Sequence, residues 1–159
     1  MRLLLLAGTA LLIAGCATGP QDQNAYLQVS LTGIQEVPGP GDPDGNGTAE
    51  VRVKPGGGEI CWSVHVRAIG PATAAHIHRG DAGSAGPVAV PLTTPDSAGH
   101  SEGCTTVDPA LAREIAFRGY SFYLNVHDEA HPNGAIRGQL RGGPRPPRER
   151  GFRVSPSGG

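Results

Sequence analysis

The residues of this sequence best suited to chemistry are three histidines in two short segments of alternating polarity. His76 and His78 are separated by one residue, so in an extended strand both imidazoles face the same side, about 7 Å apart at the backbone. In the second segment, Tyr123, Asn125 and His127 share one face. Imidazole nitrogens are good ligands for Cu²⁺ and Zn²⁺. If the two segments are neighbouring strands, the sequence predicts a copper or zinc site made of His76, His78 and His127.

Two alternatives for this site stay open at the level of sequence. A fourth ligand can come from Asp128, His131, Glu36 or water, and the same polar faces can instead form a buried hydrogen-bonded network without metal. His65 and His100 are predicted to lie outside the site, because neither has a partner at metal-ligand spacing along the chain.

The amino terminus carries the pattern of an export signal. Arg2 is followed by an apolar stretch, residues 3–14, which is too short to span a bilayer and fits the core of a signal peptide. It leads into Ile13-Ala14-Gly15-Cys16, which resembles the lipobox of bacterial lipoproteins. The resemblance implies removal of residues 1–15, lipidation of Cys16 and anchoring in the cell envelope, on the periplasmic face of an outer membrane or on the cell surface. The alternative is an ordinary secretory signal.

The two remaining cysteines form an even pair in an exported chain. Export to an oxidising compartment favours a disulfide between Cys61 and Cys104, and neither residue belongs to a CxxC motif. Such a bridge closes a loop of about 43 residues, which is worth ~4 kcal/mol in the chain-entropy treatment. The alternative is that both thiols are metal ligands.

The elements that must position these residues are short strands. Of 159 residues, 25 are Gly and 15 are Pro, which argues against long helices, while 38% hydrophobic residues suffice for the core of one domain. Alternating segments recur at the spacing of a sandwich or barrel. One short helix is predicted, Pro109–Phe117, with Asp108 as its N-cap. The predicted strands are 26–32, 48–54, 59–69, 72–78, 87–92, 104–107, 121–127 and 135–140.

These patterns divide the chain into a polar tether at 16–25, one domain at 26–141 and a disordered Arg-, Pro- and Gly-rich tail at 142–159. The formal net charge of −1 argues against a nucleic-acid partner. The sequence contains no GxSxG motif, P-loop or GxGxxG motif. We therefore expect no enzyme activity.

Four motifs, in order, resemble those of the chordin-type (CHRD) domain. They are LTGIQEVP at 31–38, AAHIHRG at 74–80 leading to GPVAVPL at 86–92, YLNVH at 123–127, and PNGAIRGQL at 132–140. The resemblance implies an all-β fold, a single immunoglobulin-like or superoxide-dismutase-like Greek-key β-sandwich. Two departures from the pattern are Asp128, where many relatives have Thr, and Ala135, where Glu is usual and would be a partner for Arg137.

The motif residues Glu36, Asn125 and Arg137 are expected to converge with the three histidines on one polar site. The function expected first is that of a membrane-anchored, non-enzymatic binding or scaffold lipoprotein with an envelope protein as partner. The alternative is a periplasmic copper- or zinc-binding protein. A superoxide-dismutase-like enzyme is the least favoured, because such a site needs more histidines than the three clustered here and the evidence is fold analogy.

Overall fold

The computed structural model describes residues 23–144, and these form one nine-stranded antiparallel sheet with a single α-helix. The strand order is β5-β4-β7-β8-β1-β2-β3-β6, and β9 also pairs with β1. The strands are β1 (Ala25–Thr32), β2 (Asn46–Lys54), β3 (Glu59–Arg67), β4 (Ala72–Arg79), β5 (Val88–Leu92), β6 (His100–Thr106), β7 (Phe122–Asp128), β8 (Ile136–Gln139) and β9 (Arg141–Pro144). The prediction of an all-β fold with one short helix is confirmed.

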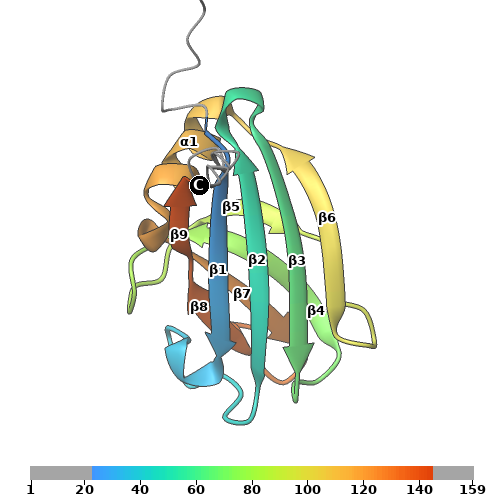
Figure 1. The fold of residues 1–159 in the computed structure, drawn as a ribbon. Coiled ribbons are helices and arrows are strands. Elements are labelled where there is room, and N and C mark those ends of the chain that lie inside the picture. Colours follow the sequence, from blue (N-terminus) through green and yellow to red (C-terminus); the bar gives the residue numbers. More distant parts are fainter. Residues whose placement is uncertain (1–22, 145–159) are drawn as a thin grey trace, which may run out of the picture.

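The sheet bends into two facing layers, as Figure 1 shows: β1, β2, β3 and β6 lie in front, and β4, β5 and β7 cross behind them. The layers are continuous, because β1 pairs with β8 through Thr32 and Arg137. The two ends of the path, β5 and β6, do not pair with each other within residues 23–144. The result is a nearly closed barrel rather than two separate sheets.

Strict alternation of apolar and polar residues produces the core between the layers. In β1 every second side chain is buried, β2 continues the pattern from Ala49, and β3 departs from it only at Cys61, which is also buried. In β7, Phe122, Leu124 and Val126 face the core from the opposite layer. The same period therefore turns Tyr123, Asn125 and His127 to the other face of β7. The candidate site lies on this non-core face of the rear layer.

The helix α1 (Pro109–Phe117) covers one end of the core, where Ala112, Ile115 and Ala116 are fully buried. Its predicted N-cap is confirmed, because the Asp108 side chain accepts a hydrogen bond from the amide of Ala110. Three 3₁₀ turns complete the elements: η2 (Gly33–Gln35), η3 (Pro55–Gly57) and η4 (Gly119–Ser121). Within the described residues, no helix is long and apolar enough to span a membrane.

The disulfide between Cys61 and Cys104 is confirmed, and it joins residues directly opposite each other on β3 and β6.

The domain boundaries differ slightly from those expected, because β1 begins at Ala25 and β9 runs to Pro144. Residues 142–144, expected at the start of the tail, thus belong to the sheet, since pairing with β1 satisfies their backbone groups despite their lack of apolar side chains. The predicted signal peptide, Cys16 and most of the tether and tail lie outside the described residues.

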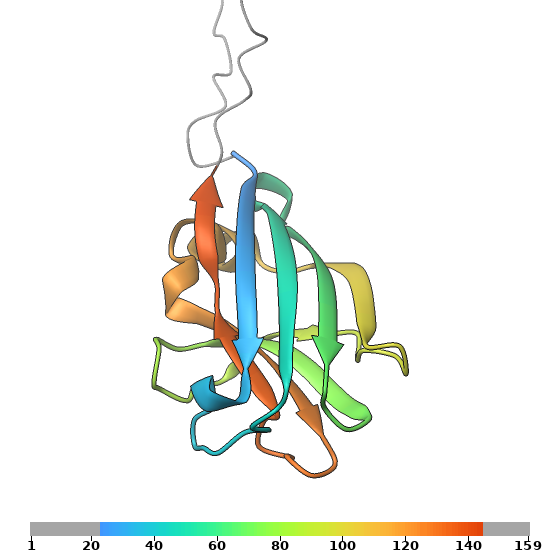
Figure 2. The same cartoon turned by 60° about the horizontal axis from the view of Figure 1, so that its bottom comes forward.

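Loops gather at one end of the barrel, which comes forward in Figure 2. They connect η2 to β2, β3 to β4, and β7 to β8. A further loop between β4 and β5, residues 80–87, folds back over the non-core face of β7 and β8, and we call it the covering loop. Arg137 and Gln139 of the sheet donate hydrogen bonds to carbonyls of the covering loop, and the amide of Gly86 in that loop donates to the hydroxyl of Tyr123.

Candidate functional site

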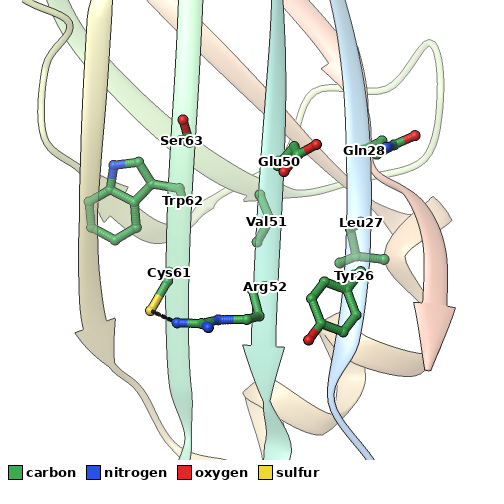
Figure 3. A pocket seen from close by; sticks show the side chains of 9 residues that line it. All are labelled: Tyr26, Leu27, Gln28, Glu50, Val51, Arg52, Cys61, Trp62 and Ser63. Carbon is green, nitrogen blue, oxygen red and sulfur yellow. Dashed lines mark hydrogen bonds between the residues drawn. The ribbon is translucent and has the colours of Figure 1, made fainter. Parts of the chain in front are cut away.

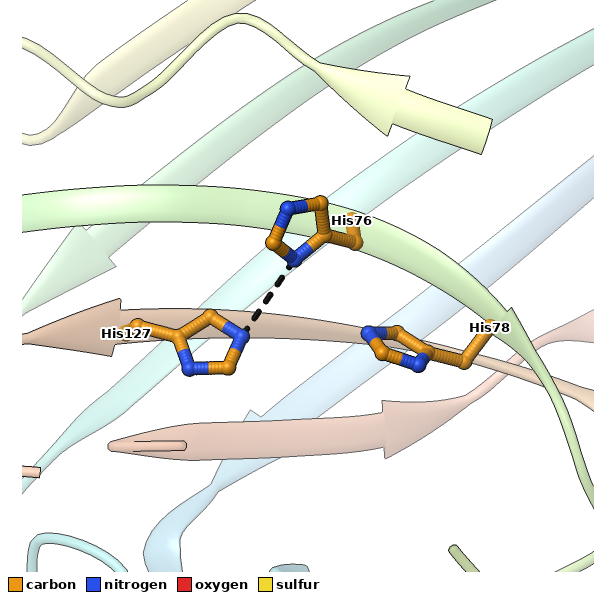
Figure 4. Close-up of side chains that lie close together, drawn as sticks. All are labelled: His76, His78 and His127. Carbon is orange, nitrogen blue, oxygen red and sulfur yellow. Dashed lines mark hydrogen bonds between the residues drawn. The ribbon is translucent and has the colours of Figure 1, made fainter. Parts of the chain in front are cut away.

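The three histidines predicted to share a site do meet. β4 and β7 are neighbours, with His76 opposite Asn125 and His127 opposite Ala74. A ligand-type nitrogen of each imidazole lies within 4.8 Å of those of the other two, and all three residues are half-buried. Figure 4 shows the rings of His76 and His78 from β4 turned toward the ring of His127 from β7.

Backbone carbonyls determine which nitrogens face the cluster. His78 Nδ1 donates to the carbonyl of Gly86 at 2.9 Å, and His127 Nδ1 donates to the carbonyl of Pro132 at 3.0 Å. A carbonyl only accepts, so both Nδ1 atoms carry the proton and both Nε2 atoms keep a lone pair. Such carbonyl contacts are typical of metal-binding histidines, because they fix the tautomer and the ring orientation.

The spacing of the nitrogens fits a four-coordinate metal ion. His76 Nδ1 and His127 Nε2 lie 3.3 Å apart, and Figure 4 marks this contact. Two imidazole ligands at the usual Zn–N distance of about 2.0–2.1 Å, in a tetrahedral arrangement, place their nitrogens about 3.3–3.4 Å apart. The nitrogens of His76 and His127 therefore already have the spacing of two ligands of one Zn²⁺ or Cu²⁺ ion, and a nitrogen of His78 lies within 4.8 Å of both ligand atoms.

The surroundings of the cluster lower the pKa of two of its histidines. Burial lowers the pKa of His76, and repulsion by His127 and His78 lowers it further. The pKa of His78 is also lowered, chiefly by burial, although its hydrogen bond to Gly86 and the nearby side chain of Asn125 work in the opposite direction. Neutral imidazoles are the form that binds metal, so protons compete weakly for these two ligands at neutral pH.

A buried guanidinium lies beside the histidines. Arg137 on β8, opposite Asn125, is 1% exposed and donates through one nitrogen to the carbonyls of Asp81 and Ser84 in the covering loop, at 3.0 and 2.8 Å. Its carbon Cζ lies 3.4 Å from the centre of the Tyr123 ring. His78 stacks on the same ring from the strand on the other side of β7, at 4.8 Å between centroids. Tyr123 therefore links the arginine to the histidine cluster.

The last predicted member, Glu36, lies next to Arg137. Burial raises the pKa of Glu36 to about 7, and the opposing attraction of Arg137 is too weak to cancel that effect. Glu36 Oε1 has no hydrogen-bond partner, although the residue is only 5% exposed. The carboxyl group packs against Gly134, where any side chain would collide with it and where φ is +137°. Glu36 and Arg137 are therefore two buried polar side chains close to each other.

Comparison with protein families identifies the domain that carries these residues. The model of the CHRD domain matches residues 27–140, which is more than half of the chain and contains the whole site. The chain belongs to the CHRD domain family. No curated protein and no solved structure matches it.

Two further ligands considered from the sequence of this CHRD domain lie elsewhere. Asp128 and His131 form a separate group with Asp42 at the loop end of the barrel. The oxygens of Asp128 accept hydrogen bonds from the amides of Gly70 and His131 and from His131 Nδ1. Burial opposes ionisation of Asp128, but these hydrogen bonds outweigh it and the pKa is lowered. Asp128 therefore joins two loops of the CHRD domain.

A second pair of histidines in the CHRD domain was missed by spacing along the chain. His65 on β3 lies directly opposite His100 on β6, and their ring centroids are 4.4 Å apart. Both side chains are exposed, and His65 Nε2 lies 3.4 Å from the hydroxyl of Ser63. Only strand register could reveal this pair, because the two residues are far apart in sequence.

The sequence analysis also did not predict the covering loop, because this loop acts through backbone carbonyls, which any residue type can supply.

A shallow pocket of about 440 Å³ lies on the exposed face of β1, β2 and β3 of the CHRD domain, away from the histidines. Figure 3 shows it, with Arg52 donating to the sulfur of Cys61. That sulfur belongs to the disulfide, so this pocket offers no free thiol. The side chains lining the pocket are Tyr26, Leu27, Gln28, Glu50, Val51, Arg52, Cys61, Trp62 and Ser63.

Proposed function

We propose that this protein is a membrane-anchored extracytoplasmic lipoprotein whose CHRD domain binds one copper or zinc ion through His76, His78 and His127. The observation that carries the proposal is the pair of backbone carbonyls that hold His78 and His127 with their Nε2 lone pairs toward His76. Imidazole nitrogens favour Cu²⁺ and Zn²⁺ over Mg²⁺ and Ca²⁺, which prefer oxygen ligands.

The role of each residue follows from its contacts. The three half-buried imidazoles would hold the ion, which would supply a positive charge to the site. Gly86 and Pro132 orient two of the rings through their carbonyls. The proposal assigns binding to this site and no reaction.

Metal content of the full chain tests the binding proposal. After loading with Cu²⁺ or Zn²⁺ and removal of excess metal by gel filtration, elemental analysis should find one ion per chain. His78→Ala should lose it, whereas the exposed control pair, His65→Ala with His100→Ala, should retain it. Absence of stoichiometric metal from the folded wild-type chain would contradict the proposal.

The anchor is tested separately, in bacteria that express the full chain. Metabolic labelling with a fatty acid should mark the protein, and Cys16→Ser should abolish both the label and recovery in the membrane fraction. An unlabelled wild-type protein that is secreted in soluble form would support the ordinary secretory signal instead.

A second candidate function, binding of an envelope protein, is favoured by one observation. Ile34 at the loop end of the barrel is 94% exposed, which leaves an isoleucine side chain almost entirely in water. A photo-crosslinking side chain at position 34 should capture an envelope protein in intact cells, and the same group at the exposed Tyr120 should not. Equal or absent capture at both positions would count against this second function.

A further inference from the structure

Asn125 occupies the centre of the candidate site. It lies on β7 with His76 opposite it on β4, Arg137 opposite it on β8, and His127 two residues along the same strand. Residues paired across strands and residues two apart in a strand share a face, so all of these side chains lie on one side of the sheet. Asn125 is 3% exposed, and its side-chain oxygen Oδ1 has no hydrogen-bond partner.

A second buried acceptor without a partner lies next to it. His78 Nδ1 donates to Gly86, so a neutral imidazole leaves only a lone pair on His78 Nε2, and that atom is also buried and unpaired. The Asn125 amide oxygen faces this ring, since its interaction with His78 favours a positive charge there. Asn125 Oδ1 and His78 Nε2 are thus two buried acceptors without a partner on the same face of neighbouring strands.

The nearby guanidinium of Arg137 makes no hydrogen bond to either acceptor. Arg137 is held over the Tyr123 ring and by two carbonyls of the covering loop, and its other terminal nitrogen makes no hydrogen bond. A buried polar atom without a partner costs about 1–3 kcal/mol. A cation placed between Asn125 Oδ1 and the lone pair of His78 Nε2 would satisfy both of these unpaired atoms.

We propose that Asn125 is the fourth ligand of the metal ion, through its side-chain oxygen, which gives a site of three imidazole nitrogens and one amide oxygen. This inference rests on the proposed function of the three histidines. Imidazole together with an oxygen ligand suits Cu²⁺ and Zn²⁺. The unpaired acceptors of the metal-free chain are then the cost in stability of a preformed cation site.

Two substitutions in the full chain test the proposal. Asn125→Leu keeps the size and removes the oxygen, and we expect it to weaken Cu²⁺ binding by about 10-fold or more. Asn125→Asp keeps the oxygen and adds a negative charge, and we expect it to bind Cu²⁺ more tightly than wild type. Asn46→Asp, at an exposed position on β2, is the matched control and should leave the affinity within twofold.

Two further readouts separate a ligand from a structural residue. Electron paramagnetic resonance of the Cu²⁺-loaded chain should show a changed copper environment in both Asn125 variants. In the metal-free state, Asn125→Leu should unfold at the same temperature as wild type or higher, because it removes an unsatisfied acceptor rather than a hydrogen bond.

The outcomes are distinguishable. If wild type binds Cu²⁺ and Asn125→Leu binds it with the same affinity and spectrum, Asn125 is not a ligand and the three-histidine proposal stands. If Asn125→Leu lowers the melting temperature of the metal-free chain without changing Cu²⁺ affinity, the amide is a structural hydrogen-bonding group and the inference is wrong. If wild type itself binds no Cu²⁺ or Zn²⁺, the proposed function fails first. Should Asn125→Leu not fold, the affinity and spectrum of Asn125→Asp decide the question.

Discussion

Two groups of histidines in this domain lie in opposite environments. His76, His78 and His127 lie on the rear layer, half-buried beside the covering loop, and two of them donate to backbone carbonyls. His65 and His100 lie on the front layer, exposed and edge to face with each other. Both groups bring imidazoles within a few ångströms. The two groups differ in their surroundings, because backbone carbonyls fix the tautomers of two rear imidazoles, and this is the feature on which we base the proposed metal site.

The largest expected effect is the loss of stability on removing the disulfide of the front layer, which also carries the exposed histidine pair. Replacing both Cys61 and Cys104 by Ala should lower the free energy of unfolding by about 3–4 kcal/mol, because the disulfide closes a loop of 43 residues. Denaturant unfolding of the metal-free chain measures this change. At temperatures where the variant is folded, its Cu²⁺ affinity should match wild type, because the disulfide joins β3 to β6 in the front layer and the histidines lie on β4 and β7 in the rear layer. A large loss of affinity would show that the two regions are coupled.

The next largest effect is the loss of Cu²⁺ affinity when one histidine of the rear cluster is replaced. His127→Ala removes a proposed ligand on which the 3.3 Å contact with His76 depends. We expect Cu²⁺ affinity to fall at least about 100-fold, which corresponds to about 2.7 kcal/mol. Competitive titration with a chromophoric chelator measures it. Binding should also weaken on acidification, because protons and metal compete for the same nitrogens. An affinity change below twofold would remove His127 from the site.

The third effect concerns the buried carboxyl beside the cluster. The pKa of Glu36 is raised from 4.5 to about 7 by burial. The folded state therefore holds this proton more tightly than the unfolded chain, so the stabilisation is full below pH 4.5 and is lost as the pH rises toward 7. Glu36→Gln cannot ionise, and at pH 8 it should be more stable than wild type by about 1–3 kcal/mol. At pH 4 the two proteins should unfold at similar denaturant concentrations. A variant that is less stable than wild type at pH 8 would show that the ionised carboxylate stabilises the fold.

The smallest expected effect on stability and metal binding concerns the exposed pair on the front layer. Replacing His65 and His100 together by Ala changes exposed residues only, so stability should change by less than about 0.5 kcal/mol. Isothermal titration with Zn²⁺ should give the same stoichiometry and an affinity within twofold. Loss of one bound ion per chain would instead mean that the exposed pair binds metal too.

The sequence predicted most of what periodicity controls. Alternation located the strands and the face of each side chain, and the Asp108-Pro109 pair located the start of the helix. The sequence underestimated β6, which begins at His100 rather than at residue 104, because Ser101, Glu102 and Gly103 carry no apolar alternation and are held by pairing with β3. The same lack of local signal hid β9, whose residues are paired only through β1.

What the sequence alone determined is therefore local. It placed His76 and His78 on one face, left Cys61 and Cys104 as an even pair, and contained the motifs of the CHRD domain that residues 27–140 match. Only the tertiary structure decided that β4 lies beside β7, that His65 meets His100, and that the carbonyls of Gly86 and Pro132 orient two imidazoles. Strand order and backbone acceptors carry no signature in residue type, because pairing joins distant segments and every residue has a carbonyl group.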